Sequence, residues 1–322
     1  MKAAVIRQIG SFEIENLPPP SPAPGEVRVK VAFAGLCRTD LKLIEVGHRD
    51  LVLPRIPAEE VSGTVDALGD GTDLDWLGKR VYVYPGTSCG SCGPCRSGAG
   101  NLCEHMQIMG FHRDGGFAEY VTTPAASLIE LASDLDFESA VFAEPLSCCL
   151  NALELAHLTA GEQLGVWGAG PAGTLLARAG AAMGATPIVI EPDPRRRLLA
   201  GGVQDLPPGM ALDVAIPAVG TPEAYHDAWL RLGPRGRLVI FSGLSRTSSC
   251  QSVDFNTLHY REQTLVGAYG CSYRHGVAAL KLIRSGKVKV ADLISHRIPL
   301  SRLAEGLDLV RRRTGMKILI YP

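Results

Sequence analysis

Hydrophobic and polar residues alternate along residues 26–33 (EVRVKVAF), where a charged or polar residue follows almost every apolar one. A period of two predicts a strand with one face buried and the other exposed to water. Residues 61–69 (VSGTVDALG), 79–86 (KRVYVYPG) and 117–124 (FAEYVTTP) are typical of further short strands. The first third of the chain is therefore predicted to be an antiparallel β-rich domain with many turns.

The pattern changes in the middle of the chain. Residues 163–192 (QLGVWGAGPAGTLLARAGAAMGATPIVIEP) contain an apolar strand, a glycine-rich turn, a helix rich in Ala and Leu, and a second apolar strand. This is one βαβ unit, which implies a parallel sheet. Short apolar runs at residues 212–220, 236–245 and 264–270 predict further buried strands of the same sheet.

The last fifty residues return to mixed structure. Residues 301–315 (SRLAEGLDLVRRRTG) predict a helix with Leu303, Leu307 and Val310 on one face and with Gly315 as its end. The final residues, KILIYP, predict a terminal strand. The fold class is therefore α/β, with a parallel-sheet domain inserted between two parts of a β-rich domain.

Length and charge exclude several classes of protein. The chain has 322 residues, enough for two domains, and its 32 Lys and Arg against 33 Asp and Glu leave a net charge of −1. The chain therefore has no large excess of positive charge that would favour binding to nucleic acid or to an anionic membrane. No apolar run is long enough to span a bilayer, and Arg7 follows the start too soon for a signal-peptide core. We expect a cytoplasmic enzyme without a nucleic-acid or membrane partner.

Four of the nine cysteines lie close together, in the sequence SCGSCGPCRSGAGNLCE. Without a secretory signal, such a cluster indicates metal rather than disulfides. The spacing C-x2-C-x2-C-x7-C favours a structural zinc with all four positions filled by protein, and the alternative is an iron–sulfur cluster. The expected ligands are Cys89, Cys92, Cys95 and Cys103.

The sequence GAGPAG places glycines at positions 168, 170 and 173, directly after a strand and at the start of a helix. This context predicts a dinucleotide site, because the glycines allow a tight turn, a close approach of the pyrophosphate and close helix–strand packing. The free N–H groups of the helix start would face the phosphates. The expected cofactor-binding residues here are Gly168, Gly170, Pro171, Ala172 and Gly173.

Glu191 stands at the end of the second strand of this unit. A carboxylate at this position can accept hydrogen bonds from both ribose hydroxyls and would repel a 2′-phosphate, so it favours NAD over NADP. The run Arg195–Arg197 argues the other way, and Arg196 is included among the expected cofactor contacts.

Several segments together resemble the medium-chain dehydrogenase/reductase family, in its zinc-dependent alcohol and polyol dehydrogenase branch. They are GLCRTD, the four-cysteine segment, NLCE through DGGFAEYV, AEPLS, the nucleotide motif and ISHRIPL. The cysteine segment and AEPLS are more similar to sorbitol and threonine dehydrogenases than to quinone reductases. The resemblance implies a GroES-like β-rich catalytic domain (1–147, with a structural zinc lobe at 86–104) split around a Rossmann doubly wound parallel-sheet domain (148–269), with a C-terminal return (270–322).

The resemblance also implies roles for single residues. Cys37, Thr39 and Glu60 would be catalytic, with Thr39 relaying the alcohol proton unless it only caps the following helix. Asp40 would fix its loop rather than react. The nicotinamide would be held by two loops, through Val219 and Gly220 and through Val266, Gly267 and Ala268.

One departure concerns the catalytic metal. The family usually carries Gly-His-Glu where this chain has Ala58-Glu59-Glu60, so a glutamate replaces a histidine ligand of the catalytic zinc. The expected metal ligands become Cys37, Glu59, Glu60 and Glu144, a first shell more negative than Zn²⁺ prefers in a catalytic site. His48 is a further possible ligand. A second departure is a shortened βα segment after the RRRLLAGG helix, which affects the adenine side of the nucleotide domain.

Three hypotheses follow for this site. In the first, Glu59 replaces the histidine as a zinc ligand. In the second, the metal is lost or weakly held and carboxylates transfer the proton. In the third, the protein binds nucleotide without turnover. We expect hydride transfer between NAD and a secondary alcohol such as a polyol, sugar, cyclitol or amino alcohol. A zinc-free carbonyl reductase is the enzymatic alternative. Family resemblance also predicts a homo-oligomer.

Overall fold

The computed structural model describes residues 1–322 and divides them into two compact units. Unit 1 comprises Met1–Glu144, Ser272–Ser285 and Val290–Pro322, and unit 2 comprises Pro145–Cys271 and Gly286–Lys289. The chain thus leaves unit 1 after Glu144 and returns to it at Ser272. No helix combines the length and the apolar character that crossing a membrane would require.

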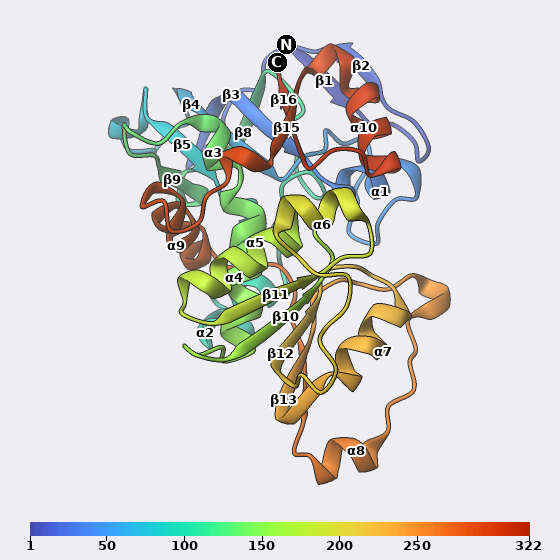
Figure 1. Ribbon diagram of the computed structural model, residues 1–322. Helices are drawn as coiled ribbons and strands as arrows, with labels where there is room; N and C mark the ends of the chain where they lie inside the picture. The colour runs from blue at the N-terminus through green and yellow to red at the C-terminus, as the bar shows by residue number, and fades with distance from the viewer. The chain divides into compact units, whose positions relative to one another are not determined.

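Unit 1 is built on a seven-stranded sheet in the order β15-β16-β3-β4-β5-β9, with β8 also pairing with β3. A short ribbon β1-β2 accompanies it (Figure 1). A second short ribbon pairs β6 with β7. Its strands are β1 (Lys2–Val5), β2 (Glu13–Asn16), β3 (Glu26–Leu36), β4 (Glu60–Leu68), β5 (Arg80–Val83), β6 (Gly86–Thr87), β7 (Gln107–Ile108), β8 (Tyr120–Pro124), β9 (Leu128–Glu130), β15 (Ile294–Pro299) and β16 (Lys317–Tyr321). Its helices are α1 (Arg38–Glu45), α2 (Gly93–Arg96), α3 (Phe137–Val141), α9 (Tyr273–Arg284) and α10 (Leu303–Arg312).

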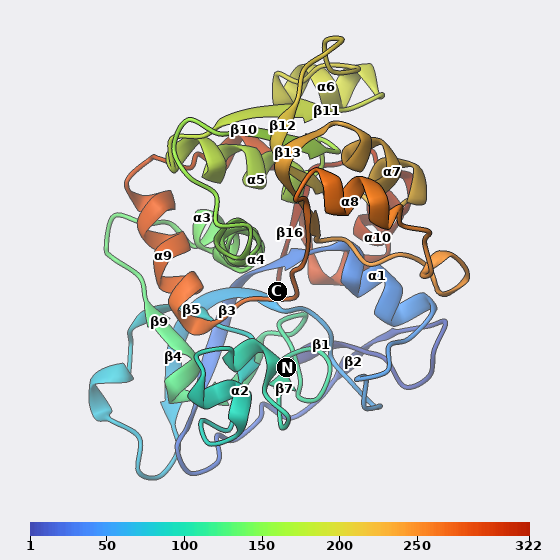
Figure 2. The same cartoon turned by 90° about the horizontal axis from the view of Figure 1, so that it is seen from below.

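The predicted alternation in β3 is confirmed. Val27, Val29 and Val31 are buried in the core of unit 1, while the residues between them are more exposed. β3 pairs antiparallel with β4, β8 and β16, so it is the central strand of the sheet (Figure 2). The segment that follows β3 is consequently held from several sides.

The C-terminal helix α10 differs from the prediction at its end. Leu303 and Leu307 are buried and Val310 packs against the same core, as the 3.6-residue period predicts. The prediction that Gly315 ends the helix is wrong, because Arg313 takes the left-handed conformation (φ 56°) and donates its N–H to the carbonyls of Leu309 and Val310. A left-handed residue closes a helix C-terminus, and glycine is only the most favoured residue there.

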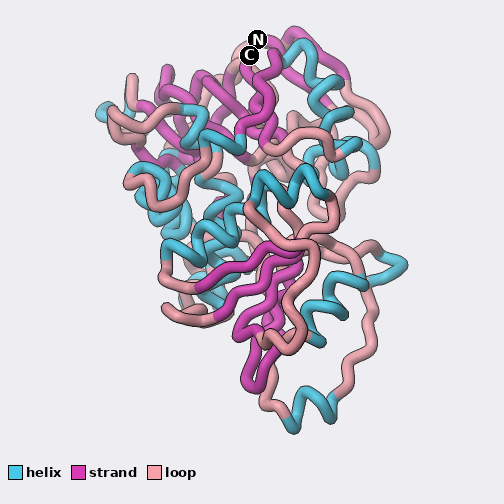
Figure 3. The backbone as a smooth tube through the Cα atoms, in the orientation of Figure 1, coloured by secondary structure: helices cyan, strands magenta, loops and turns pink.

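Unit 2 contains a five-stranded sheet in the order β11-β10-β12-β13-β14, and every neighbouring pair is parallel. Figure 3 draws the strands in magenta and the helices in cyan. The strands of unit 2 are β10 (Gln163–Trp167), β11 (Thr186–Ile190), β12 (Leu212–Pro217), β13 (Leu232–Ile240) and β14 (Thr264–Gly267). Its helices are α5 (Pro171–Ala182), α6 (Pro194–Ala200), α7 (Pro222–Leu230) and α8 (Phe255–Tyr260), and it holds most of α4 (Ala143–Leu155). α5 packs on β10 and β11, and α7 packs on β12 and β13.

The edge of this sheet beyond β11 is short. After α6 the chain forms only an isolated parallel bridge, between Ile190 and Val203, before β12 begins at Leu212. This is the segment that the resemblance predicts to be shortened.

Candidate functional site

The predicted cofactor residues of unit 2 lie at one edge of the parallel sheet. Gly168 follows β10, Glu191 follows β11, Val219 and Gly220 follow β12, and Val266–Ala268 lie at the end of β14. Because these strands are parallel, their carboxyl ends meet at the same edge, where α/β sheets bind their ligands.

The glycine turn has the geometry that the motif predicts. Gly168 has φ 103°, and a Cβ on Gly173 would lie 1.8 Å from the Gly168 carbonyl oxygen, so both positions require glycine. Gly170 is the N-cap of α5, and the space beside its Cα is open. A Cβ atom placed on Gly170 would have Arg196 Nη1 as its nearest neighbour, at 3.8 Å. A phosphate could therefore approach the backbone at Gly170 and at the start of α5, close to a guanidinium.

Glu191 is held by the backbone on both sides. One carboxylate oxygen accepts the N–H of Ala169 at 2.8 Å and the other accepts the N–H of Asp193 at 3.0 Å. The residue is 7% exposed. A carboxylate offers about four lone-pair sites, so two acceptor sites remain for hydroxyl groups.

The four predicted zinc cysteines come together in unit 1. The sulfur atoms of Cys89, Cys92, Cys95 and Cys103 all lie within 4.8 Å of one another, with pairs at 3.4, 3.8 and 4.0 Å. Tetrahedral zinc with Zn–S bonds of about 2.3 Å requires sulfurs about 3.8 Å apart. The geometry fits one zinc ion, and a multi-iron cluster would need its cysteines farther apart.

Backbone N–H groups point at these sulfurs as well. Cys89 N donates to Cys103 Sγ at 3.2 Å, His105 N donates to the same sulfur at 3.3 Å, and Cys92 N donates to Cys89 Sγ at 3.4 Å. Such donors stabilise thiolates, the form in which cysteine binds metal.

The segment after β3 brings Cys37 and Asp40 together with the Ala58–Glu60 turn. Cys37 is the N-cap of α1, and Asp40 accepts the N–H of Cys37 at 2.9 Å and the N–H of Ala58 at 3.1 Å. Asp40 is buried, and this burial raises the pKa of its carboxyl to about 6. Asp40 thus ties α1 to the second segment, which agrees with the predicted structural role.

Ala58 has φ 87°, a left-handed conformation that favours glycine. The resemblance predicts glycine at this position, and the left-handed conformation occurs here although the residue is alanine. Thr39 lies within α1 and is exposed, so the alternative that Thr39 caps this helix is wrong, since Cys37 takes that place.

Glu60 has a partner that the sequence did not reveal. Both of its carboxylate oxygens accept hydrogen bonds from Lys317 Nζ at 2.6 Å, and the two residues are only 2% and 3% exposed. Burial acts to lower the pKa of Lys317, but the negative charges of Glu60, Cys37 and Glu144 outweigh it and the pKa lies above its usual value. The raised pKa favours the charged ammonium form of Lys317 beside Glu60.

The predicted catalytic metal ligands Cys37, Glu59, Glu60 and Glu144 do not form one group of converging ligand atoms in this arrangement. Both oxygens of Glu60 are engaged by Lys317, and Cys37, Glu59 and Glu60 do not form a group with all ligand atoms within 4.8 Å. Burial, and then the charges of Asp40 and Glu60, raise the pKa of Cys37 well above its usual value. Glu59 is half-buried, as is Glu144 at the start of α4.

Two further features lie outside this set. His48 is exposed, with Phe111 and Asp50 as neighbours. In unit 2, the sulfur atoms of Cys148 and Cys271 lie within 4.8 Å of each other. Cys148 lies one turn after Glu144 on α4.

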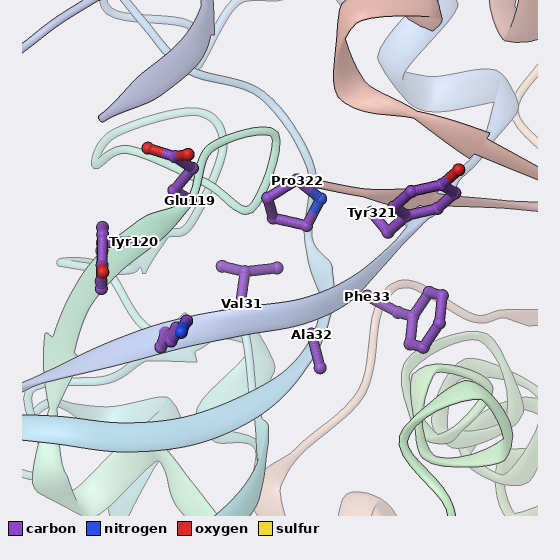
Figure 4. Close-up of a pocket in the computed structure, with 8 residues that line it drawn as sticks. Val31, Ala32, Phe33, Glu119, Tyr120, Tyr321 and Pro322 are labelled. Atoms are coloured by element: carbon purple, nitrogen blue, oxygen red, sulfur yellow. The ribbon is translucent and has the colours of Figure 1, made fainter.

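A groove of about 500 Å³ on unit 1 contains none of the predicted site residues (Figure 4). It is lined by Lys30, Val31, Ala32 and Phe33 of β3 and by Glu119, Tyr120, Tyr321 and Pro322. The Phe33 and Tyr321 rings meet edge to face, with centroids 6.3 Å apart. We therefore do not place the active site there.

Residues 23–133 match the model of the alcohol dehydrogenase GroES-like domain. D-altritol 5-dehydrogenase from Agrobacterium fabrum is 30% identical over 318 residues, which covers 94% of each chain. This chain belongs to the zinc-dependent medium-chain dehydrogenase/reductase family. Its class is that of NAD(P)-dependent alcohol dehydrogenases, which confirms the family predicted from the sequence motifs.

Solved structures of this family agree with the fold. An alcohol dehydrogenase from Escherichia coli CFT073 complexed with NADH has a TM-score of 0.92 at 26% identity, covering 100% of this chain and 99% of its own. A protein described as a zinc-binding dehydrogenase from Sinorhizobium meliloti 1021, bound to NADP, has a TM-score of 0.93 at 28% identity with the same coverage. The split GroES-like and Rossmann architecture of the family is thus the architecture of this chain.

Proposed function

We propose that this protein transfers hydride between NAD and a secondary alcohol that carries neighbouring hydroxyl groups, as in a polyol or a sugar derivative. The observation that carries the proposal is the nucleotide edge of unit 2, where the open backbone at Gly170 and the carboxylate of Glu191 stand at the ends of adjacent parallel strands. The relative from Agrobacterium fabrum acts on a polyol, which supports the substrate class.

On the nucleotide side, the N–H groups at the start of α5 would bind the pyrophosphate, with Arg196 beside them. The remaining lone pairs of Glu191 would accept the ribose hydroxyls, and its charge would repel the 2′-phosphate of NADP. The loops that contain Val219 and Gly220, and Val266–Ala268, would hold the nicotinamide ring. The NADP complex of the Sinorhizobium meliloti protein is the reason to test this preference directly.

On the substrate side, hydride leaves the carbinol carbon for C4 of the nicotinamide while the hydroxyl proton passes to a base. We propose Glu59, half-buried and adjacent to Glu60 at the start of β4, as the proton acceptor. Thr39, exposed on the first turn of α1, would pass the proton to water. Zinc in the four-cysteine lobe would stabilise that lobe and take no part in the chemistry.

The cofactor assignment is tested by kinetics on a panel of polyols, sugar acids and amino alcohols with NAD and with NADP. We expect turnover with NAD, and in Glu191→Gln a rise of about tenfold in the ratio of kcat/KM for NADP to that for NAD, since a tenfold change corresponds to about 1.4 kcal/mol of lost discrimination. Glu223→Gln, an exposed glutamate of α7, is the control and should leave the ratio unchanged.

An unchanged ratio in Glu191→Gln would remove Glu191 from cofactor selection. Absence of turnover across the whole panel, with NADH still bound, would favour the non-catalytic alternative. The cytoplasmic location and the homo-oligomer stay predictions.

A further inference from the structure

Two cysteines of unit 2 belong neither to the four-cysteine lobe nor to the proposed hydride transfer. Cys148 lies in α4, and Cys271 is the last residue of unit 2 before the chain returns to unit 1. Their sulfur atoms lie within 4.8 Å of each other, and no disulfide joins them in this structure. The two residues are 123 positions apart in the sequence, so the fold and not the local chain brings the sulfurs together.

The backbone beside Cys271 is tied to the same face of α4 that carries Cys148. Asn151 lies three residues after Cys148, which places the two side chains on one face of the helix. The amide nitrogen of Asn151 donates to the Gly270 carbonyl at 2.9 Å and to the Tyr269 carbonyl at 3.4 Å. Asn151 is buried, so water competes little for these bonds. The segment that ends in Cys271 is therefore held against α4.

This segment also has the freedom to bring the sulfurs into bonding distance. A disulfide requires an S–S distance of about 2.05 Å, so the two cysteines must approach each other. Gly270, directly before Cys271, has φ 59°, and a Cβ atom placed on it would meet no atom within 4 Å. Gly267 has the same open space. A backbone that contains two such glycines can adjust at little steric cost.

The two thiols differ in their access to solvent. Cys148 is half-buried, whereas Cys271 is buried. A small oxidant therefore reaches Cys148 first, and Cys271 is placed to react with the oxidised product, as in cysteine pairs that sense oxidants. Cys149 is a different case, because it is fully buried and its sulfur donates to the carbonyl of Ala172 at 3.5 Å.

We propose that Cys148 and Cys271 form a modification site, at which hydrogen peroxide produces a reversible disulfide that fixes the segment after β14 to α4. The Cys148 sulfur attacks one peroxide oxygen, the O–O bond breaks, and Cys148 becomes a sulfenic acid as the first water leaves. The Cys271 sulfur then attacks the Cys148 sulfur, and the S–O bond breaks. The hydroxyl leaves as the second water with the proton of Cys271.

The electrons and the reversal of this step are accounted for. Two electrons pass from the two sulfurs to one peroxide molecule, which is reduced to two waters. A dithiol reductant restores both thiols by exchange. In a reducing compartment such a bond forms only while oxidant is present.

The fixed segment begins directly after Val266–Ala268, the loop proposed to hold the nicotinamide ring. A disulfide at Cys271 would restrict the movement of this loop at its C-terminal side. The link to the cofactor rests on the proposed function, but formation of the disulfide is measured without turnover, so the two can fail separately.

The first test treats the zinc-loaded, reduced wild type with a small excess of hydrogen peroxide, alkylates the remaining thiols and digests the protein without reductant. We expect mass spectrometry to find a peptide pair that contains Cys148 and Cys271, two hydrogens lighter than the separate peptides and absent after dithiothreitol. Cys149→Ser should give the same pair, and Cys148→Ser should give none. Both sulfurs alkylated in the peroxide-treated wild type, or the same pair in Cys148→Ser, would overturn the inference.

The second test measures amide hydrogen exchange in the segment that joins β14 to α9, before and after oxidation. We expect exchange to slow at least about tenfold in the oxidised wild type, because the bond suppresses local opening. Cys250→Ser, which removes an exposed cysteine, should slow equally, and Cys148→Ser should not slow. Unchanged exchange in a wild type that contains the linked peptides would overturn the claim that the bond fixes this segment.

Metal content separates oxidation from metal binding by the same two sulfurs. The wild type and Cys148→Ser, both purified without chelators, should hold equal numbers of metal ions per chain. A metal ion lost in Cys148→Ser would assign the pair to metal binding and overturn the inference. If Cys148→Ser does not fold, the linked peptides of the wild type still decide the question.

The proposed function is judged by a different result. If the linked peptides form but the reduced protein oxidises no alcohol, the inference stands and the proposed function fails. If the reduced protein oxidises alcohols and no linked peptides form, the reverse is true.

Discussion

Gly35 connects the sheet of unit 1 to the chemistry of the site, because the Glu60 carboxylate fills the space above its Cα. The smallest possible side chain at this position must displace either that carboxylate or the neighbouring Val141. We predict that Gly35→Ala lowers the free energy of unfolding by about 1–3 kcal/mol, the usual cost of overpacking. Urea denaturation measures it, and Gly243→Ala, which meets no atom within 4 Å, is the control. Equal stability of the two variants would show that Glu60 can move freely.

Glu59 is the residue on which the proposed proton transfer depends. We predict that Glu59→Gln lowers kcat by about a hundredfold with little change in KM. A general base accepts the proton in the transition state, so its removal destabilises the transition state and not the bound substrate. Glu13→Gln, an exposed glutamate of β2, should leave kcat unchanged. Steady-state kinetics at saturating NAD decide the point. A Glu59→Gln variant with normal kcat would assign the proton to another group.

Lys317 is the residue of this site that local sequence patterns did not identify. Cys37, Glu60 and the glycine motif could be identified because each belongs to a short local pattern. The partner of Glu60 is 257 residues away, and only the sheet order brings β16 beside β3. A signal was present, since a lysine that opens an otherwise apolar strand, KILIY, must find a counter-ion if the strand is buried.

At the level of elements, an ion pair in unit 2 joins the turn before β10 to strand β13. Glu162, in the turn before β10, accepts the N–H of Thr159 at 2.8 Å and pairs with Arg237 of β13. Burial acts to raise the pKa of Glu162, but these donors outweigh it and the pKa lies below its usual value. A lowered pKa means that the charged form stabilises the fold, so its contribution is present above the usual carboxyl pKa of about 4.3 and is lost as the pH falls.

We therefore predict that Glu162→Gln is less stable than wild type by about 1 kcal/mol at neutral pH, and that the difference shrinks towards zero as the pH falls below about 4. Urea denaturation at a series of pH values between neutral and acid measures it. Asp205→Asn, which removes a more exposed partner of Arg231, should show a much smaller difference at every pH. A difference for Glu162→Gln that persists in acid would mean that packing, and not charge, is lost.

The elements themselves were largely predictable, and their ends were not. Alternation in residues 26–33 and the βα pattern around GAGPAG correspond to β3, β10, α5 and β11. The end of α10 was misplaced, because Arg313 adopts a left-handed conformation two residues before Gly315. Local preference for glycine at a helix end is weak compared with the packing of Leu303 and Leu307 that fixes where the helix lies.

For the whole molecule, family resemblance predicted the split arrangement, and the physical pattern alone predicted a parallel sheet between two β-rich parts. What neither could supply is how the altered Ala58-Glu59-Glu60 segment is accommodated. The backbone keeps the left-handed turn at Ala58, Asp40 still ties it to α1, and the charge balance is restored by Lys317. The turn at Ala58, its bond to Asp40 and the ion pair of Glu60 with Lys317 thus hold this segment in place.

The central claim is hydride transfer from a secondary alcohol to NAD, and the most direct measurement follows the hydrogen itself. A polyol deuterated at its carbinol carbons is incubated with the protein and NAD, and the reduced cofactor is analysed by mass spectrometry and by NMR at C4. The account predicts NADH that carries deuterium at C4, with a slower rate than for the undeuterated polyol where hydride transfer limits turnover. NADH without deuterium, or no NADH from any polyol, sugar acid or amino alcohol, would contradict it.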